Sequence, residues 1–191
     1  IGNSSSGFGF DRTSGAINRI AIDGFDFLKG AFFPSFYRCP SNVDRTDKSF
    51  VLAKTIFSKE TDYEAIQSSL EFVGCSYGDR DGVYEIVSRY KSFAMKGDVV
   101  IFYEIESADS MLVTLCFTPK YDMVRYGLIV PIVKEDMLCK WYGRGPGESY
   151  YDRKNASRIG LFAAGADKIY HPYARPAENS SHTDTHTLEL L

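Results

Sequence analysis

The chain has 191 residues, a formal net charge of −3 and 44% hydrophobic residues, which suits one domain with a sizeable core. A mildly acidic chain without a basic block lacks the electrostatic surface for nucleic acid, so we expect no such partner. No apolar run reaches membrane-spanning length, so we expect no membrane partner, and no signal peptide is visible at Ile1. Residues 1–7 look like a linker, which leaves a cytoplasmic and a periplasmic location open.

Strand signals dominate the first residues of the chain. Residues 8–10 and 16–22 are separated by a turn that ends at Gly15, and a second turn follows at residues 23–24. This pattern predicts an antiparallel hairpin meander. Residues 31–37 form an aromatic-rich extended segment, in which Pro34 favours an edge or crossing strand.

Residues 63–73 are ambiguous. Their apolar positions fit an amphipathic helix, and the alternation over Ile66, Ser68, Leu70 and Phe72 fits a strand equally well. We favour a strand that ends at Gly74, because the neighbouring segments are strands.

Further strands are predicted at residues 82–90, 99–106, 111–117 and 126–132, with short turns between them. Consecutive short strands of this kind are typical of an antiparallel sheet. The 13 Tyr and 14 Phe also favour half-buried pleated surfaces. The sequence therefore predicts an all-β antiparallel sandwich, as one domain over residues 1–191.

The four cysteines are widely spaced and form no CxxC or Cys/His cluster. This spacing argues against a zinc site, and we expect neither a metal nor a cofactor in this chain. Two disulfides are one alternative, although buried free thiols are favoured. Cys75 lies between Gly74 and Ser76 at a predicted loop end, and is expected to be the most exposed of the four.

Residues 140–153, KWYGRGPGESYYDR, resemble the motif W-x-G-x-G-P-x-E-N-Y-x-D-R in the last domain of family 2 glycoside hydrolases of the β-galactosidase type. Residues 10–15, 36–44, 125–128 and 173–179 resemble further motifs of this family, in the same order. The chain departs from the family pattern at several polar positions: Asn42, Val43, Ser149, Ala177, His182 and His186. It is identified as a divergent member over nearly its whole length.

The resemblance implies a galactose-mutarotase-like antiparallel supersandwich. It also implies that the catalytic glutamates lie on a separate barrel domain, which takes about 250 residues, and that the parent hydrolyses terminal β-galactosides. Family domains continue past the position of Leu191, with a tryptophan at the rim of the sugar site. We therefore expect a fragment that is incomplete at its C-terminus. Unpaired strand edges then favour self-association, or a frayed tail over residues 177–191.

The motif contains six candidates for carbohydrate contacts or for a domain interface: Trp141, Arg144, Glu148, Tyr150, Asp152 and Arg153. For the charged members a self-contained ion-pair network is the favoured alternative. For the aromatic members core or interface packing is favoured. The glycines around Pro146 are interpreted as a tight turn rather than a phosphate loop, because proline lacks an N–H donor and no Lys-Ser/Thr pair follows.

The histidines offer two weaker possibilities. His182, Asp184 and His186 alternate, so a strand would place them on one face, where a solvated surface is favoured over a metal site. A mutarotase-like acid/base site would require His171 beside Glu148 or Glu178, and the sequence does not bring them together. We expect no catalytic residue in this chain.

Three functional hypotheses follow. The favoured one is a non-catalytic accessory domain that packs on the catalytic barrel and other domains of a β-galactosidase-like parent and helps to shape its sugar site. The second is a free-standing carbohydrate-binding or aldose-epimerase-like module. The third is a structural sandwich that supports assembly of an oligomer, and fold alone does not decide among them.

Overall fold

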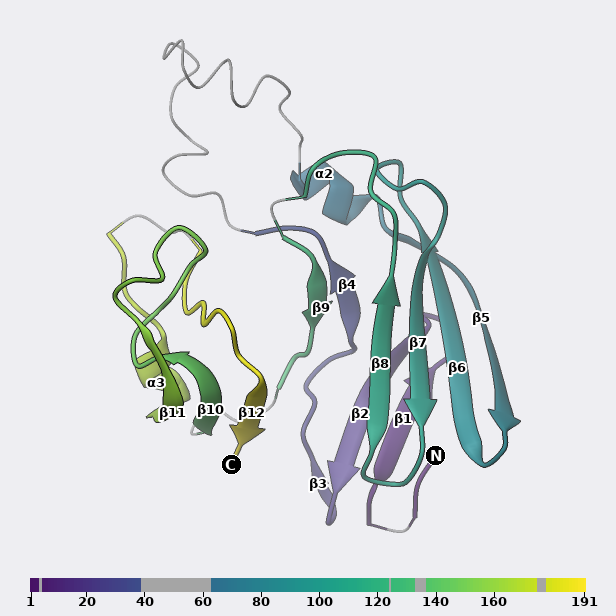
Figure 1. The fold of residues 1–191 in the computed structure, drawn as a ribbon. Coiled ribbons are helices and arrows are strands. Elements are labelled where there is room, and N and C mark those ends of the chain that lie inside the picture. The colour runs from purple at the N-terminus through teal and green to yellow at the C-terminus, as the bar shows by residue number, and fades with distance from the viewer. Residues whose placement is uncertain (4, 39–62, 124, 133–136, 175–177) are drawn as a thin grey trace. The chain divides into compact units, whose positions relative to one another are not determined.

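A computed structural model describes residues 1–3, 5–38, 63–123, 125–132, 137–174 and 178–191. Within these ranges the chain forms twelve strands and two short helices (Figure 1). The residues divide into two compact units. Unit 1 lies within Ile1–Arg38 and Lys59–Val133, and the described part of unit 2 lies within Lys134–Leu191. The expectation of a single domain over residues 1–191 stays a prediction.

Unit 1 begins with the predicted meander. Strands β1 (Gly7–Asp11), β2 (Ala16–Ile22) and β3 (Phe25–Asp26) pair antiparallel in the order β1-β2-β3. The turn before β2 requires Gly15, which has a φ of +68° and lies so close to the Phe72 ring that a Cβ would be 2.1 Å from it. Strand β4 (Phe33–Ser35), which contains the proline, pairs with β9 (Gly127–Ile129) and with no other described strand, so the prediction of an edge or crossing strand is confirmed.

The larger sheet of unit 1 is a four-stranded antiparallel meander. It consists of β5 (Glu71–Arg80), β6 (Val83–Lys91), β7 (Val99–Ile105) and β8 (Met111–Cys116), in sequence order. Alternate residues of β7 are buried, from Val99 to Ile105, as expected when one face of a sheet covers a core. The buried cluster combines this face with residues of β1, β2 and the helix α2 (Tyr63–Ser68).

The helix α2 corrects the strand predicted over residues 63–73. Residues 63–68 are helical, and β5 begins at Glu71 and continues through Gly74 with a bulge between Phe72 and Gly74. Tertiary contacts decide between the two periodicities. Ile66 is fully buried, and the Gln67 side chain bonds to the backbone of Pro34 and Phe36 at 3.0 and 2.8 Å.

The cysteine prediction is wrong in one respect. Cys75 lies within β5 and is half-buried, whereas Cys116 at the end of β8 is exposed and Cys139 is buried. All three are free thiols, and Cys39 lies outside the described residues.

Unit 2 is built on a three-stranded antiparallel sheet. Its central strand β10 (Leu138–Gly145) pairs with β11 (Arg158–Gly165) on one side and with β12 (Thr187–Leu190) on the other. A short helix, α3 (Ala166–Ile169), follows β11. The last residues are therefore paired with β10, and the expected frayed tail is wrong, while self-association stays a prediction.

The glycines of the motif also differ from the prediction. Gly143 and Gly145 lie inside β10, and the turn begins only at Pro146. A Cβ at Gly143 would lie 2.7 Å from the Thr185 Cα, and one at Gly145 would lie 2.6 Å from the Phe162 ring. Close packing across the strand, rather than turn formation, therefore requires these glycines.

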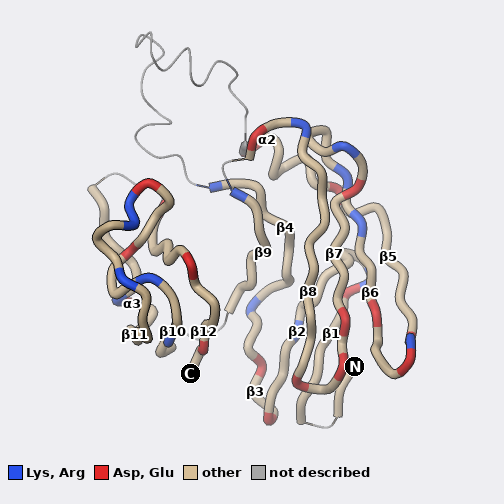
Figure 2. The backbone as a smooth tube through the Cα atoms, in the orientation of Figure 1, with Lys and Arg blue, Asp and Glu red and all other residues tan. Residues whose placement is uncertain are grey.

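The all-β antiparallel class is confirmed, and the finer galactose-mutarotase-like assignment stays a prediction. Acidic and basic residues are interspersed along the described chain (Figure 2). No helix in the described ranges is long and apolar enough to span a membrane.

Candidate functional site

The motif of residues 140–153 occupies β10 and the loop after it, and the segment of residues 178–186 runs alongside. Backbone bonds join the two: the Arg144 N–H donates to the Thr183 carbonyl at 3.3 Å, and the Ser149 N–H donates to the Ser181 carbonyl at 2.8 Å. The buried Ser149 hydroxyl accepts the Thr183 N–H at 2.8 Å. Ser149 thus links the two segments at the position where the family pattern has asparagine.

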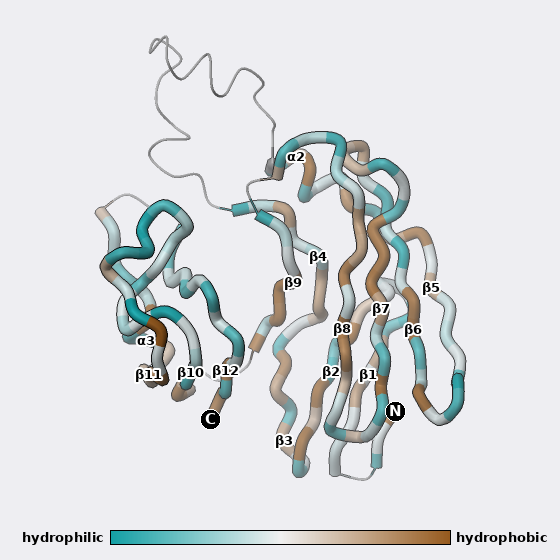
Figure 3. The backbone as a smooth tube through the Cα atoms, in the orientation of Figure 1, coloured by the Kyte–Doolittle hydropathy of each residue, from teal (hydrophilic) through white to brown (hydrophobic). Residues whose placement is uncertain are grey.

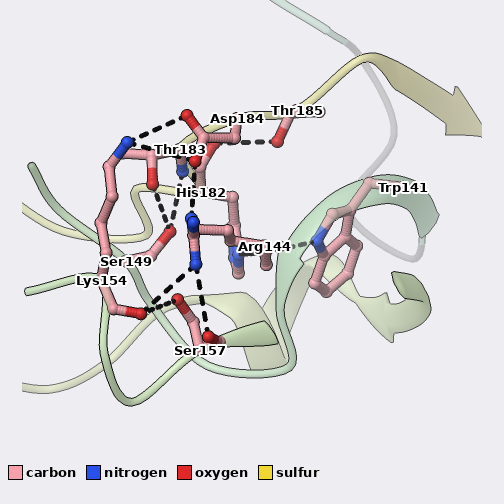
Figure 4. A network of polar contacts seen from close by, with 9 residues as sticks. All are labelled: Trp141, Arg144, Ser149, Lys154, Ser157, His182, Thr183, Asp184 and Thr185. Atoms are coloured by element: carbon pink, nitrogen blue, oxygen red, sulfur yellow. Dashed lines mark hydrogen bonds and ion pairs between the residues drawn. The ribbon is translucent and has the colours of Figure 1, made fainter. Parts of the chain in front are cut away.

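Arg144 belongs to a polar network within unit 2 (Figure 4). Its Nε donates to Asp184 at 2.6 Å, and Lys154 contacts the same carboxylate at 3.0 Å. The Arg144 guanidinium also lies 3.4 Å from the Ser157 carbonyl oxygen. The hydrogen bonds from Arg144 and Lys154 hold the pKa of the Asp184 carboxyl below its ordinary value. For Arg144 the structure therefore shows the self-contained ion-pair network.

Trp141 packs inside unit 2 and is only 4% exposed. Its ring centroid lies 5.6 Å from that of Phe162 and 4.5 Å from that of His182. Its indole N–H donates to the Arg144 carbonyl at 3.0 Å (Figure 4). The ring thus has packing and hydrogen-bond partners within the chain, which is the packing alternative rather than an open stacking surface.

Glu148 is the centre of a second cluster. Its carboxylate accepts hydrogen bonds from the Tyr150 hydroxyl at 3.1 Å, from the Tyr173 hydroxyl and from the Ser180 backbone N–H. Burial acts to raise the pKa of Glu148, but these three donors outweigh it and leave the pKa below its ordinary value. Burial, followed by the charge of Glu148, raises the pKa of Tyr150 to about 12. The cluster therefore holds an ionised carboxylate beside neutral phenols.

His171 lies close to this cluster, although the sequence did not bring them together. Its ring contacts Tyr173 edge-to-face, with centroids 4.4 Å apart. The Asn179 side chain accepts the His171 N–H at 2.9 Å and donates to its carbonyl. The charge of His171 also acts to lower the pKa of Glu148. Tyr173, Asn179 and Ser180 are thus site residues that were not among the six candidates. The motif of residues 173–179 pointed to the first two, and Ser180 follows it directly.

The remaining candidates lie at the surface. Asp152 and Arg153 are both exposed, in the turn after Tyr150. The Arg153 N–H donates to the Tyr150 carbonyl at 3.0 Å, and its side chain acts to lower the pKa of Tyr173 against the stronger effect of Glu148. The structure thus groups Glu148, Tyr150 and Arg153, whereas Asp152 is exposed in the turn after them.

The three alternating residues of the tail do not share a strand face. Asp184 has a φ of +56° and binds Arg144 and Lys154, while His182 contacts Trp141 and His186 contacts Tyr142. Residues 182–186 form no strand, so the shared face that a strand would have given them is not present. The described residues contain no group of three or more His, Cys, Asp or Glu that could hold a metal ion.

Comparisons with known proteins agree with the motif. A family model described as β-galactosidase small chain matches residues 2–191. The chain is 25% identical over 199 residues to a β-galactosidase of Pseudoalteromonas haloplanktis, covering 95% of this chain and 18% of that protein. A β-galactosidase of Priestia megaterium is 26% identical over 92% of this chain and 16% of its own length.

A β-galactosidase of Kluyveromyces lactis is 36% identical over 56% of this chain and 10% of its own length. The chain thus spans less than a fifth of these curated relatives. The motif and the family model agree over nearly all residues, and the chain belongs to the β-galactosidase small-chain family.

Proposed function

We propose that this accessory domain packs on the catalytic barrel of a β-galactosidase and helps to shape its sugar site, so that the whole enzyme hydrolyses terminal β-galactosides. The observation that carries the proposal is the small-chain family match over residues 2–191. The relatives that align over nearly the whole chain, from Pseudoalteromonas haloplanktis and Priestia megaterium, are named β-galactosidase. These matches do not favour a free-standing epimerase-like module.

The fold supports a division of labour with another part of the enzyme. The described residues form strands and two short helices, whereas a (β/α)₈ barrel needs about 250 residues. A retaining glycosidase also needs two carboxyl groups about 5 Å apart across the scissile bond. The groups that hydrogen-bond to Glu148 are instead two phenols and a backbone N–H. Glu148 is therefore suited to binding and positioning rather than to nucleophilic attack.

The Glu148 cluster offers groups that suit a sugar. An ionised carboxylate accepts hydrogen bonds from hydroxyl groups, and phenol oxygens both donate and accept them. Tyr151 is exposed and follows Tyr150, and Tyr170 is exposed and precedes His171. Tyrosine rings pack on the apolar faces of sugars. We expect these side chains to face the sugar site of the assembled enzyme.

The test uses the native protein. An antibody against unit 1 precipitates the product from an extract of the source organism, and hydrolysis of a chromogenic β-galactoside is measured in the precipitate. We expect activity that pre-immune serum does not precipitate, and a denatured band far above 21.5 kDa or a second large polypeptide. A band near 21.5 kDa alone, with no activity, would overturn the proposal.

A further inference from the structure

The sheet of unit 2 has two different faces, set by the register of β10. On the inner face, Trp141 lies opposite Phe162. On the outer face, Tyr142 lies opposite Leu161 of β11 and Thr187 of β12. The outer face consists of these positions and their alternating neighbours on the three strands: Leu138, Lys140, Tyr142, Arg144, Ile159, Leu161, Ala163, Gly165, Thr187 and Glu189. The charge of Arg144 is already paired with Asp184.

The outer face is exposed but largely apolar. The exposed fraction is 83% for Leu161, 46% for Ile159, 44% for Tyr142 and 38% for Leu138. A solvated face of an antiparallel sheet normally carries polar side chains. Large apolar side chains gathered on one exposed face mark an interaction surface.

The sequence of strand β11 also indicates that both of its faces are covered in the native protein. From Ile159 to Gly165 it contains no charged and no polar side chain, so both of its faces are apolar (Figure 3). Such uninterrupted apolar runs are typical of strands that are covered on both sides. Phe162 has its cover in Trp141, at a centroid distance of 5.6 Å, whereas Leu161 on the other side is exposed.

The outer face also contains a groove, and the charged residues that line it have opposite signs. A groove of about 540 Å³ is lined by outer-face residues of all three strands, among them Tyr142, Leu161 and Ala163, together with Trp141 and Phe162 of the inner face. Its two charged lining residues, Lys140 and Glu189, lie 4.0 Å apart and offset each other. A neutral, apolar groove suits a protein surface better than an anionic or highly polar ligand.

We infer that the outer face packs against an apolar surface of the remaining β-galactosidase polypeptide, outside residues 1–191. The occupant follows from the relatives: in the Pseudoalteromonas haloplanktis protein the matched region is 18% of the length, so most of the polypeptide lies beyond it. The inference rests on the proposed function, because it requires that the chain works within such a polypeptide. Leu161, the most exposed residue of the face, is the expected centre of the contact.

The experiment compares hydroxyl-radical labelling of the native protein with that of the isolated chain, both bound to the unit 1 antibody. Trypsin cleaves after Arg158 and Lys168, so Leu161 and its inner-face neighbour Phe162 fall in one peptide, and their labelling ratio is its own control. In the isolated chain Leu161 should be strongly labelled. In the native protein the Leu161-to-Phe162 ratio should fall by about fivefold, as expected for a residue at an interface core.

Three results would overturn the inference. Equal ratios in both samples would mean that the face stays open in the native protein. Protection of Leu161 in a monomeric isolated chain would place the cover within residues 1–191. Protection that appears in the isolated chain only as its concentration rises would identify a second copy as the occupant. Failure of the proposed function is separate, because it is measured as absence of hydrolysis in the precipitate, whatever the labelling shows.

Discussion

Replacing Phe162 with alanine should destabilise the isolated chain far more than replacing Leu161, although the two residues are neighbours on β11. Phe162 packs against Trp141 and beneath Gly145, on the inner face of the sheet. Leu161 is 83% exposed on the outer face. The first substitution removes a packed ring and leaves a cavity, whereas the second removes a side chain with little cover.

The magnitudes follow from this difference. A buried phenylalanine costs about 3–5 kcal/mol when truncated to alanine, and Phe162 is partly exposed, so we expect about 3 kcal/mol. An exposed residue away from special features changes stability by no more than about 0.5 kcal/mol. With an m-value of about 2 kcal/mol/M in urea, Phe162→Ala lowers the unfolding midpoint by about 1.5 M and Leu161→Ala by about 0.25 M at most.

Urea unfolding followed by tryptophan fluorescence checks this expectation. Trp141 is the only tryptophan, so its emission reports on unit 2 in both variants. Equal midpoint shifts for the two variants would refute the reasoning, because they would mean that Leu161 is as well packed as Phe162 within the chain. A shift for Leu161→Ala alone would reverse the assignment of the two faces.

Three further outcomes are expected. Gly145→Ala should destabilise unit 2 by about 1–3 kcal/mol in thermal unfolding, because its Cβ would lie 2.6 Å from the Phe162 ring; an unchanged midpoint would contradict the close packing. The folded-state pKa of Glu148 lies below its ordinary 4.5. The ionised carboxylate therefore contributes to folding stability above pH 4.5, and this contribution is lost as the pH falls through the folded-state pKa. Glu148→Gln should therefore flatten the loss of stability below about pH 5, and identical pH profiles for both proteins would argue against this role. Tyr90→Phe should cost about 1–3 kcal/mol, because its hydroxyl donates to two backbone carbonyls before β2. Tyr103→Phe should cost less than Tyr90→Phe, because the Tyr103 hydroxyl lies near the Ile17 backbone but makes no hydrogen bond of normal geometry with the described residues, and equal losses for both variants would disprove the distinction.

The strands of unit 1 could be predicted because their sequence signals are local. Residues 16–22 and 99–105 are rich in Ile and Val and are bounded by turn residues, and both are strands. The segment over residues 63–68 lacked such a signal, since its apolar spacing fits two periods. Its helix depends on the burial of Ile66 in the core and on hydrogen bonds between Gln67 and residues just over 30 positions earlier in the chain. No local pattern contains either contribution.

In the candidate site, too, local motifs could be predicted from the sequence, whereas long-range contacts could not. The motif located Trp141, Arg144 and Glu148 correctly in one region of the fold, but their partners come from residues 157–184. Phe162 is placed by the pairing of β10 with β11, and Ser180 and Asp184 lie on the segment that leads into β12. The sequence of the motif alone could therefore not separate two clusters, one around Asp184 and one around Glu148. The left-handed backbone of Asp184, which turns its carboxylate toward Arg144, was equally beyond a reading of alternating residues.

The pairing of β10 has a consequence for the order in which the chain folds. Strands β5 to β8 are joined by short connections, such as that between Arg80 and Val83, whereas β10 pairs Cys139 with Leu190. Each doubling of a closed loop adds about 0.6 kcal/mol of entropic cost, and contacts between distant residues form slowly. During synthesis the hairpin of β10 and β11 can therefore form first, and the other edge of β10 stays unpaired until residues 187–190 have been made. In that interval this edge is the part of unit 2 most open to chaperones or to pairing with a foreign strand.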